Sequence, residues 1–290
     1  MQHNLVTPTV DLDRYGVVGH PIAHSRSPFI HGEFAAATNQ HLSYERFDVS
    51  PHHFEREVRA FFAAGGRGLN ITVPHKEAAL QLADRLTDRA RLAGAINTLA
   101  WQTDGQLLGD NTDGAGLLKD FAALGIDIKA RSVLLLGAGG ATRGILAPLL
   151  AAAPKSLTIA NRSIDRAQEL VEHFTRLQEQ IAPHIEVAGY EALHEPYDLI
   201  VHATSLGLSG STPRLDTKVV GAQTDAYDLG YGAGLTPFLT WARQLGAKST
   251  HDGLGMLIEQ AAESFALWRG VRPQTGDVRR ELRAALNAPL

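Results

Sequence analysis

The sequence contains no cysteine among its 290 residues. This absence excludes a disulfide framework, a thiol nucleophile, and zinc or iron–sulfur centres held by cysteine. It fits a reducing compartment, and we therefore predict a cytoplasmic protein. The first residues, MQHNLVTPTVDLDRYG, have neither the basic nor the apolar region of a signal peptide. No apolar run approaches the ~20 residues that a membrane span needs, so no membrane association is expected.

A large excess of charge of one sign is missing as well. Lysine and arginine number 27 against 31 aspartates and glutamates, which gives a net charge of −4. The basic residues are scattered along the chain, so we expect neither nucleic acid nor an anionic membrane as a partner. The 13 histidines show no HExxH or comparable spacing, and no metal site is predicted. A small molecule is the expected partner.

The composition that is present is that of a globular protein. Hydrophobic residues make up 44% and charged residues 20% of the chain, enough to bury a sizeable core. At roughly 150 residues per domain, the length predicts two domains with a cleft between them. Short apolar runs alternate with longer helical patterns, which is typical of βα units on a parallel sheet. We therefore predict an α/β fold.

The first domain is expected over residues 1–112. Its pattern predicts strands at 15–18, 42–49 and 68–72, and helices at 28–38, 53–64 and 75–86. Residues 97–101 and 106–109 predict a hairpin around Asp104 and Gly105. The hairpin makes this sheet mixed, although mainly parallel.

The second domain is expected over residues 113–250, with a helix at 112–124 and strands at 132–136, 157–160, 198–201 and 225–228. The run Ser132–Leu136 is almost wholly apolar, as expected of a central strand that is covered on both faces. Apolar residues from Leu254 to Trp268 follow helical spacing. We predict that residues 251–290 form C-terminal helices that pack back on the first domain.

A glycine-rich turn, Gly137-Ala138-Gly139-Gly140-Ala141, follows the predicted strand 132–136 and opens a helix. Glycines let backbone N–H groups approach a pyrophosphate, and the helix N-terminus supplies positive potential. We therefore predict a Rossmann-type dinucleotide site, with a ligand-free tight turn as the alternative. The third glycine of the GxGxxG pattern is replaced by Thr142, and Pro148 predicts a local kink in the helix.

The strand 157–160 ends in Asn161-Arg162-Ser163-Ile164-Asp165-Arg166, at the distance where such sites contact the adenosine ribose. NAD sites place a carboxylate there, whereas NADP sites place arginine for the 2′-phosphate. Asp165 lies past the strand end and is interpreted as an acidic residue in the first turn of the next helix. The two arginines predict NADP.

Polar side chains gather at strand ends of the first domain. Ser25 and Ser27 follow the first strand, where their hydroxyls suit a carboxylate, although Ser27 alone would be interpreted as a helix N-cap. Lys76 falls in the first turn of the predicted helix 75–86 and faces the unfavourable end of the helix dipole. The loss of stability that this position implies suggests that Lys76 has a function. The alternative is an ordinary surface lysine. Asn97 and Asp113 complete a set suited to a polyhydroxylated acid.

Nine segments, spread over nearly the whole chain and all in family order, resemble the shikimate dehydrogenase family. They are GHPIAHSRSP, NITVPHK, AGAINTL, GDNTDG, LLLGAGGAT, ANRSIDR, HATSLG, YDLGY followed by TPFL, and DGLGMLIEQAA. The resemblance implies reversible hydride transfer between NADPH and the ring ketone of 3-dehydroshikimate, giving shikimate, in aromatic amino-acid and chorismate biosynthesis.

The resemblance also implies the site residues. Lys76 and Asp113 would form the catalytic pair, with Lys76 either as the proton donor or as an electrostatic anchor. Shikimate would be held by Ser25, Ser27, Thr72, Lys76, Asn97, Asp113, Tyr231 and Gln260. NADP would be held by Asp88, Gly137, Ala138, Gly139, Gly140, Ala141, Asn161, Arg162, Ser163, Ile164, Asp165, Arg166, Thr204, Leu229 and Gly253.

The chain departs from the family pattern at two further places. His202 stands where the family usually has asparagine, which puts a hydrogen bond near the cofactor in doubt, and Gly232-Ala233-Gly234 predicts a more mobile loop after Tyr231. Two alternatives remain, an NAD-dependent quinate/shikimate dehydrogenase and a non-catalytic NADP-binding regulatory module. A homodimer is left open as the assembly.

Overall fold

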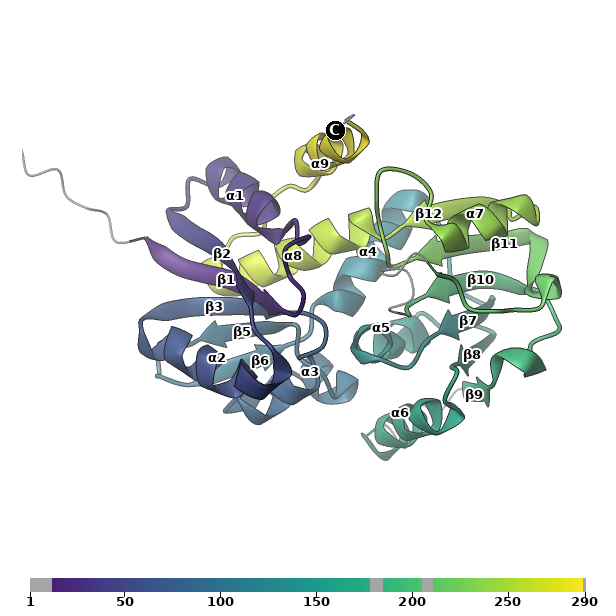
Figure 1. Cartoon of the computed structure of the whole chain (residues 1–290), viewed down its shortest axis with the longest axis horizontal. Helices are drawn as coiled ribbons and strands as arrows, with labels where there is room; N and C mark the ends of the chain where they lie inside the picture. Colours follow the sequence, from purple (N-terminus) through teal and green to yellow (C-terminus); the bar gives the residue numbers. More distant parts are fainter. Residues whose placement is uncertain (1–11, 178–184, 205–210, 289–290) are drawn as a thin grey trace, which may run out of the picture.

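The computed structural model describes residues 12–177, 185–204 and 211–288, arranged around two six-stranded sheets (Figure 1). The prediction about a signal peptide rests mostly on residues 1–11, which lie outside the described residues. Within the described ranges, no helix combines the length and the apolar character needed to cross a bilayer. Helices α4 and α8 run between the two sheets (Figure 1).

The first sheet has the strand order β2-β1-β3-β5-β6-β4. Its strands are β1 Asp13–Gly19, β2 Leu42–Asp48, β3 Gly66–Ile71, β4 Arg85–Leu86, β5 Thr98–Trp101 and β6 Leu107–Asp110, and its helices are α1 Ser27–Ala37 and α2 Phe54–Ala63. Strand β1 is parallel to both neighbours, whereas β5 is antiparallel to β3 and β6. The predicted mixed sheet and its hairpin are confirmed.

The predicted helix at 75–86 is wrong. The segment contains a short 3₁₀ turn, Ala78–Gln81, and then β4, before helix α3 begins at Asp88 and ends at Ala93. Tertiary pairing overrides the helical pattern, because Asp84 donates its N–H to Leu107 O at 2.8 Å and accepts the Leu107 N–H at 2.7 Å through Oδ2. Lys76 therefore lies in a turn, and the argument from the helix dipole does not hold for it.

The second sheet is parallel throughout, with the order β12-β11-β10-β7-β8-β9. Its strands are β7 Ser132–Leu136, β8 Ser156–Ala160, β9 Ile185–Ala188, β10 Tyr197–His202, β11 Val220–Asp228 and β12 Ser249–Asp252. Its helices are α4 Asp113–Leu124, α5 Gly140–Ala151, α6 Ile164–Leu177 and α7 Pro237–Gln244. From β7 the chain goes on to β8 and β9 on one side of β7, and it later returns to the other side of β7 as β10. A crevice is expected at this reversal, beyond the carboxyl ends of β7 and β10.

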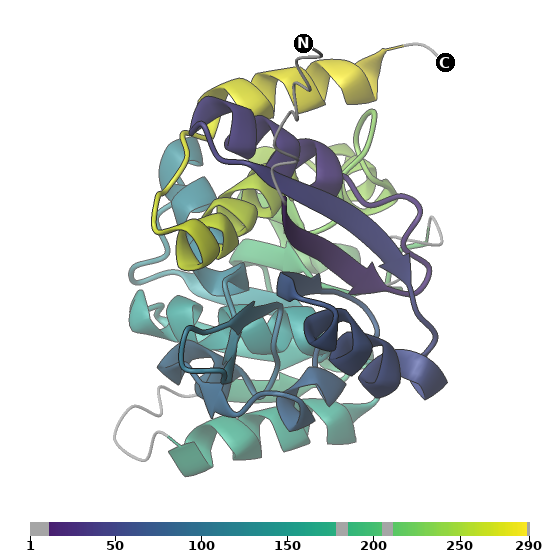
Figure 2. The same cartoon turned by 90° about the vertical axis from the view of Figure 1, so that its left-hand side faces the viewer.

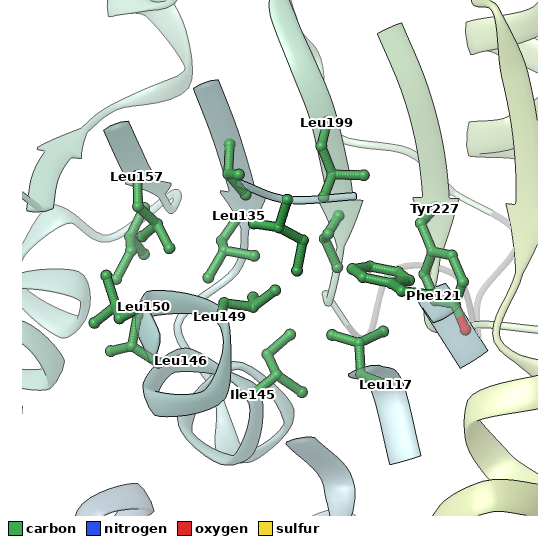
Figure 3. Close-up of a cluster of buried hydrophobic side chains, with 14 of the residues drawn as sticks. Leu117, Phe121, Leu135, Ile145, Leu146, Leu149, Leu150, Leu157, Leu199 and Tyr227 are labelled. Carbon is green, nitrogen blue, oxygen red and sulfur yellow. The ribbon is translucent and has the colours of Figure 1, made fainter. Parts of the chain in front are cut away.

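Alternate residues of β7 are buried on opposite faces of the second sheet. Leu135 packs with Ile145 and Leu149 of α5 and with Phe121 of α4 (Figure 3), whereas Leu134 belongs to the core on the other face. Full burial of such a leucine contributes about 1.5–3 kcal/mol. The prediction of a central strand covered on both faces is confirmed. Helix α5 continues through Pro148, and the kink predicted there stays a prediction.

The C-terminal helices are α8 Leu254–Arg269 and α9 Gly276–Asn287. Ile258 and Phe265 of α8 share a buried cluster with Ile30 and Phe34 of α1. Helix α9 lies beside α1 (Figure 2). Trp268 Nε1 donates to Leu99 O of the first sheet at 3.0 Å. After the second sheet, the chain therefore returns to the first one.

Candidate active site

A buried ion pair joins the turn after β3 to the start of α4. Lys76 Nζ donates to Asp113 Oδ2, and only 13% and 5% of the two side chains are exposed. The other carboxylate oxygen accepts from Asn97 Nδ2 at 2.8 Å. Both oxygens of Asp113 are thus engaged by donors, which fixes the carboxylate and aims it at the lysine.

Asn97 connects this pair to the C-terminal helix α8. Its Nδ2 lies 2.8 Å from Thr112 Oγ1 and 3.2 Å from Gln260 Oε1, and its Oδ1 accepts the Thr112 N–H at 2.9 Å. The start of β5, the start of α4 and helix α8 therefore meet at the side-chain amide of Asn97. The structure brings together Lys76, Asn97, Asp113 and Gln260, and their roles toward a substrate stay predictions.

Ser25 and Ser27 lie next to each other after β1. Their hydroxyl oxygens are 3.2 Å apart, and Arg46 Nε donates to Ser25 O at 2.8 Å. Ser27 is the first residue of α1, whereas the N-cap is Arg26 and makes no side-chain capping bond. Its interpretation as an N-cap is therefore wrong, because Ser27 is already inside the helix.

Tyr231 reaches the same region from the loop after β11. Its ring packs on the cluster that α1 and α8 share, and Arg283 Nη1 holds the loop by donating to Gly232 O at 3.1 Å. Burial raises the pKa of the Tyr231 phenol, and the nearby Arg26 guanidinium only partly offsets this. The phenol is therefore a neutral hydrogen-bond donor at physiological pH.

Thr72 follows β3 beside the end of β1. Its N–H donates to Val18 O at 2.9 Å, and a β-carbon placed on Gly19 would lie 2.6 Å from its methyl group. Glycine at position 19 is thus required by the close approach of the two strand ends. Thr72 lies at the same carboxyl edge of the sheet as the turn that carries the two serines.

The glycine turn after β7 has the geometry of an anion cradle. Gly137 has a φ of +112°, and a β-carbon there would lie 3.1 Å from Ala203 O and from the Thr204 methyl group. Gly139 is the N-cap of α5, and a β-carbon placed on it would meet nothing within 4 Å. The first N–H groups of α5 lack partners within the helix, so the turn has the features of a pyrophosphate-binding turn.

Thr142 has a structural explanation. Its buried hydroxyl donates to Gly137 O at 2.9 Å and so ties the helix back to the turn that precedes it. The irregular third position of the glycine pattern is thus compensated by a hydrogen bond that glycine cannot make.

The glycine turn and its helix lie directly against the ion pair. A β-carbon on Gly140 would lie 3.1 Å from Lys76 Cβ, and one on Gly144 would lie 2.6 Å from Asn111 Oδ1 and 2.9 Å from Asp113 Oδ2. These two glycines are one helical turn apart, so they present one bare face of α5 to the first domain. The pyrophosphate cradle and the charge pair therefore belong to one site.

The segment after β8 presents two exposed arginines, Arg162 and Arg166. Within the ranges that the structure describes, neither guanidinium lies within ion-pair distance of a carboxylate. Ile164 between them is 38% exposed, and Asn161 Nδ2 donates to Ser163 O at 2.8 Å. Asp165 lies in the first turn of α6, as predicted. The arginines remain available to an anionic ligand.

The other predicted cofactor residues come from the ends of β10, β11 and β12. Leu229 N donates to His202 O at 2.9 Å, and a β-carbon on Gly253 would lie 2.3 Å from Leu229 O. With the Thr204 methyl group against Gly137, these residues gather at the carboxyl ends of β10 and β11, beside the glycine turn. Asp88 stands apart, since its exposed carboxylate pairs with Arg91 Nη2 at 2.8 Å within α3. Its contact with cofactor stays a prediction.

Sequence reasoning missed the polar layer beneath the site. Asn70 accepts from Tyr44 OH at 2.7 Å and donates through Nδ2 to Ser264 Oγ at 3.0 Å, and burial raises the pKa of Tyr44 well above its usual value. In the sequence, Asn70 stood only as the first residue of the family-like segment NITVPHK. The spacing of four residues between Gln260 and Ser264 on α8 is a signal from which both could have been placed on one face.

Three family models match this chain. They describe a shikimate dehydrogenase substrate binding domain at residues 17–99, a shikimate/quinate 5-dehydrogenase at 120–218, and a shikimate 5′-dehydrogenase C-terminal domain at 253–283. A shikimate dehydrogenase (NADP(+)) of Aeromonas hydrophila is 51% identical over 275 residues, which span 95% of this chain and 99% of the relative.

Solved structures agree with these matches. A crystal structure of an Ael1 enzyme from Pseudomonas putida is 47% identical, with a TM-score of 0.84 over 96% of this chain and 99% of that one. The crystal structure of shikimate 5-dehydrogenase from Thermus thermophilus in complex with NADP(H) and shikimate is 34% identical, with a TM-score of 0.82 over 95% of this chain and 100% of that one.

Proposed function

The chain belongs to the shikimate dehydrogenase family, and from this membership we propose how its site carries out the family reaction. The protein is an NADP-dependent oxidoreductase that reduces 3-dehydroshikimate to shikimate, reversibly, in aromatic amino-acid and chorismate biosynthesis. The observation that carries this conclusion is the contact between the buried ion pair and the helix that follows the glycine turn. The buried Lys76–Asp113 pair lies against Gly140 and Gly144 of the helix that follows the pyrophosphate cradle.

We propose that the substrate carboxylate is held at the turn after β1. The hydroxyls of Ser25 and Ser27 lie side by side there, and the neutral Tyr231 phenol adds a donor. The guanidinium of Arg26 adds positive charge nearby. The ring hydroxyls are assigned to the polar groups around the ion pair, which are Thr72, Lys76, Asn97, Asp113 and Gln260.

Nicotinamide, when bound, supplies the hydride for the ring ketone. The carbonyl oxygen then gains negative charge, and the Lys76 ammonium both stabilises this charge and donates a proton from Nζ to the oxygen. Asp113 keeps the ammonium aimed at the substrate, because Asn97 holds its second oxygen in place. In the opposite direction, neutral Lys76 takes the hydroxyl proton back.

We propose that NADP is selected at the adenosine end by the two arginines after β8. Arg162 and Arg166 are exposed and lie beyond the carboxyl end of a strand, where a 2′-phosphate can accept from both guanidinium groups. The exposed Ile164 between them offers an apolar contact for adenine. Gly137, Ala138, Gly139, Gly140 and Ala141 would hold the pyrophosphate, and Thr204, Leu229 and Gly253 the nicotinamide end.

Three further assignments remain proposals. The division into a substrate domain at 1–112, an NADP domain at 113–250 and C-terminal helices at 251–290 is supported by the two sheets and by the packing of α8 on α1. A cytoplasmic location is supported by the absence of cysteine. The homodimer stays a prediction of the sequence.

The decisive experiment follows the reduction of NADP⁺ and NAD⁺ with shikimate and with quinate side by side. We expect kcat/KM to be largest for the pair of NADP⁺ and shikimate. A preference for NAD⁺ with quinate would favour the quinate/shikimate alternative. The absence of turnover with every pair, together with NADPH binding, would favour the regulatory module instead.

A further inference from the structure

A buried histidine bridges a carboxylate and a hydroxyl at the carboxyl end of β10. His202 Nδ1 lies 3.0 Å from Asp228 Oδ1, and Nε2 lies 2.6 Å from Thr204 Oγ1. The side chains of His202 and Asp228 are 0% and 2% exposed. The sequence left His202 as an unexplained departure from the family pattern, whereas the structure gives each of its ring nitrogens a partner.

The partners of Asp228 fix how the hydrogens are arranged. An ionised carboxylate only accepts hydrogen bonds, so His202 Nδ1 must carry a hydrogen and donate it to Asp228. In the neutral ring, Nε2 is then the acceptor and takes the hydroxyl hydrogen of Thr204. Asp228 thereby sets the tautomer of His202, and His202 in turn sets the direction in which the Thr204 hydroxyl donates.

The same carboxylate also anchors the loop that carries Tyr231. Asp228 Oδ1 accepts from Gly230 N at 2.9 Å, and Oδ2 accepts from Thr236 Oγ1 at 2.5 Å. Thr236 is the N-cap of α7 and accepts from Leu239 N at 3.3 Å. Both ends of the loop 230–236 are therefore held by Asp228.

At the other end of the bridge, Thr204 lies on the pyrophosphate cradle. Its methyl group is 3.1 Å from the position of a β-carbon on Gly137, whose positive φ shapes the turn. The chain His202, Asp228 and loop 230–236 thus leads from the cofactor crevice to the phenol assigned to the substrate carboxylate.

We propose that His202 is a positioning residue that holds Thr204 for NADP and, through Asp228, holds the Tyr231 loop for the substrate. This inference rests on the proposed function, because it takes the crevice beside Thr204 as the NADP site. An asparagine side chain at this position would have the reach of Nδ1 alone and so could serve only one of the two partners. Histidine joins both contacts in one rigid ring.

Two amide substitutions separate the two bonds of the ring. In His202→Asn, the amide can occupy the place of Nδ1 and keep the bond to Asp228, but it loses the bond to Thr204. In His202→Gln, the amide reaches the place of Nε2 and keeps the bond to Thr204, but it loses the bond to Asp228. Each lost hydrogen bond corresponds to about three- to tenfold in a binding constant.

The experiment measures the Kd of NADPH by fluorescence and the KM of shikimate for the full chain and both variants, with thermal unfolding as a check on folding. His202→Asn is expected to raise the Kd of NADPH about three- to tenfold and to leave the KM of shikimate nearly unchanged. His202→Gln is expected to raise the KM of shikimate about three- to tenfold and to leave the Kd of NADPH nearly unchanged. If His202→Asn does not fold, Thr204→Val replaces it and must weaken NADPH by a similar factor.

A matched control is the exposed pair of His194 and Asp216, whose Nδ1 and Oδ2 are 3.2 Å apart near the opposite end of β10. His194→Asn should change neither constant. Equal effects of the two His202 variants on both constants, or no effect of either, would overturn the positioning role. Failure of the unmodified chain to bind NADPH would contradict the proposed function itself, which keeps the two failures distinct.

Discussion

Gly144 of α5 lies against the carboxylate of Asp113, so closely that a β-carbon at position 144 would come within 2.9 Å of Asp113 Oδ2. The helix that begins at the pyrophosphate cradle therefore touches the group that orients Lys76. A glycine is needed here for space, since the backbone is ordinary α-helix. Cofactor cradle and proton-transfer pair are placed relative to each other by this contact.

Gly144→Ala is expected to move the Asp113 carboxylate or the helix. The added methyl group would also lie 2.6 Å from Asn111 Oδ1, which is held in place because Asn111 Nδ2 donates to Ala95 O at 2.8 Å. We expect a loss of about 1–3 kcal/mol in unfolding free energy. A misplacement near 1 Å would lower kcat by about 10².

The matched control is Gly32→Ala in α1, where an added β-carbon meets nothing within 4 Å. This change should raise stability by about 0.5–1 kcal/mol and leave kcat unaltered. Normal turnover in Gly144→Ala would show that the contact does not constrain Asp113.

Arg162→Ala is expected to weaken NADP⁺ without weakening NAD⁺. A charge-assisted bond to a phosphate contributes about 1.5–3 kcal/mol, which corresponds to roughly a 10- to 100-fold higher KM for NADP⁺. Arg166→Ala should act in the same direction. Arg176→Ala, at the far end of α6, is the control. Equal losses with NADP⁺ and NAD⁺ would contradict the assignment to the 2′-phosphate.

His31 predicts a specific dependence of stability on pH. Its ring is buried against Tyr44, with the ring centroids 4.3 Å apart, and burial lowers its pKa from 6.5 to about 3. Below pH 6.5 the unfolded chain binds a proton that the folded chain refuses, so this contribution to stability falls as pH falls from 6.5 towards 3. At pH 5 the unfolding free energy is therefore about 2 kcal/mol lower than at pH 7 because of His31.

His31→Phe keeps a ring that can stack on Tyr44 but removes the titration. Urea unfolding at pH 7 and pH 5 should therefore show a difference in unfolding free energy that is about 2 kcal/mol smaller in the variant than in the unmodified chain. An identical pH difference in both proteins would mean that His31 does not titrate as its burial implies.

Local patterns predicted the elements whose surroundings are uniform. Ser132–Leu136 could be identified as a central strand because both of its faces meet apolar helices. The polar strand Ser249–Asp252 was missed because it lies at the edge of the sheet, where β11 is its one partner among the described strands. The false helix at 75–86 failed because Asp84 bonds to Leu107, a partner that is distant in the sequence.

The site residues likewise divide into those that the local sequence indicated and those whose role depends on how distant elements pack. Local patterns indicated Asp113 at a helix start and Arg162 after a strand end, whereas Lys76 was indicated by its motif alone, since the helix predicted at 75–86 does not form. The sequence could not indicate that Gly144 faces Asp113, or that His202 bridges Asp228 and Thr204, since these contacts depend on how the elements pack. The tertiary structure supplied those relationships.

The central claim is that Lys76, held by Asp113, transfers the proton, and kcat of Lys76→Ala tests it most directly. Lys119→Ala is the control, because Lys119 lies on α4, its side chain is 41% exposed, and its Nζ donates to Glu263 Oε1 at 2.6 Å rather than to Asp113. We predict that Lys76→Ala lowers kcat by about 10²–10⁴ and raises the KM of shikimate only moderately, while Lys119→Ala keeps full turnover. A kcat of Lys76→Ala near that of the unmodified enzyme would contradict the account.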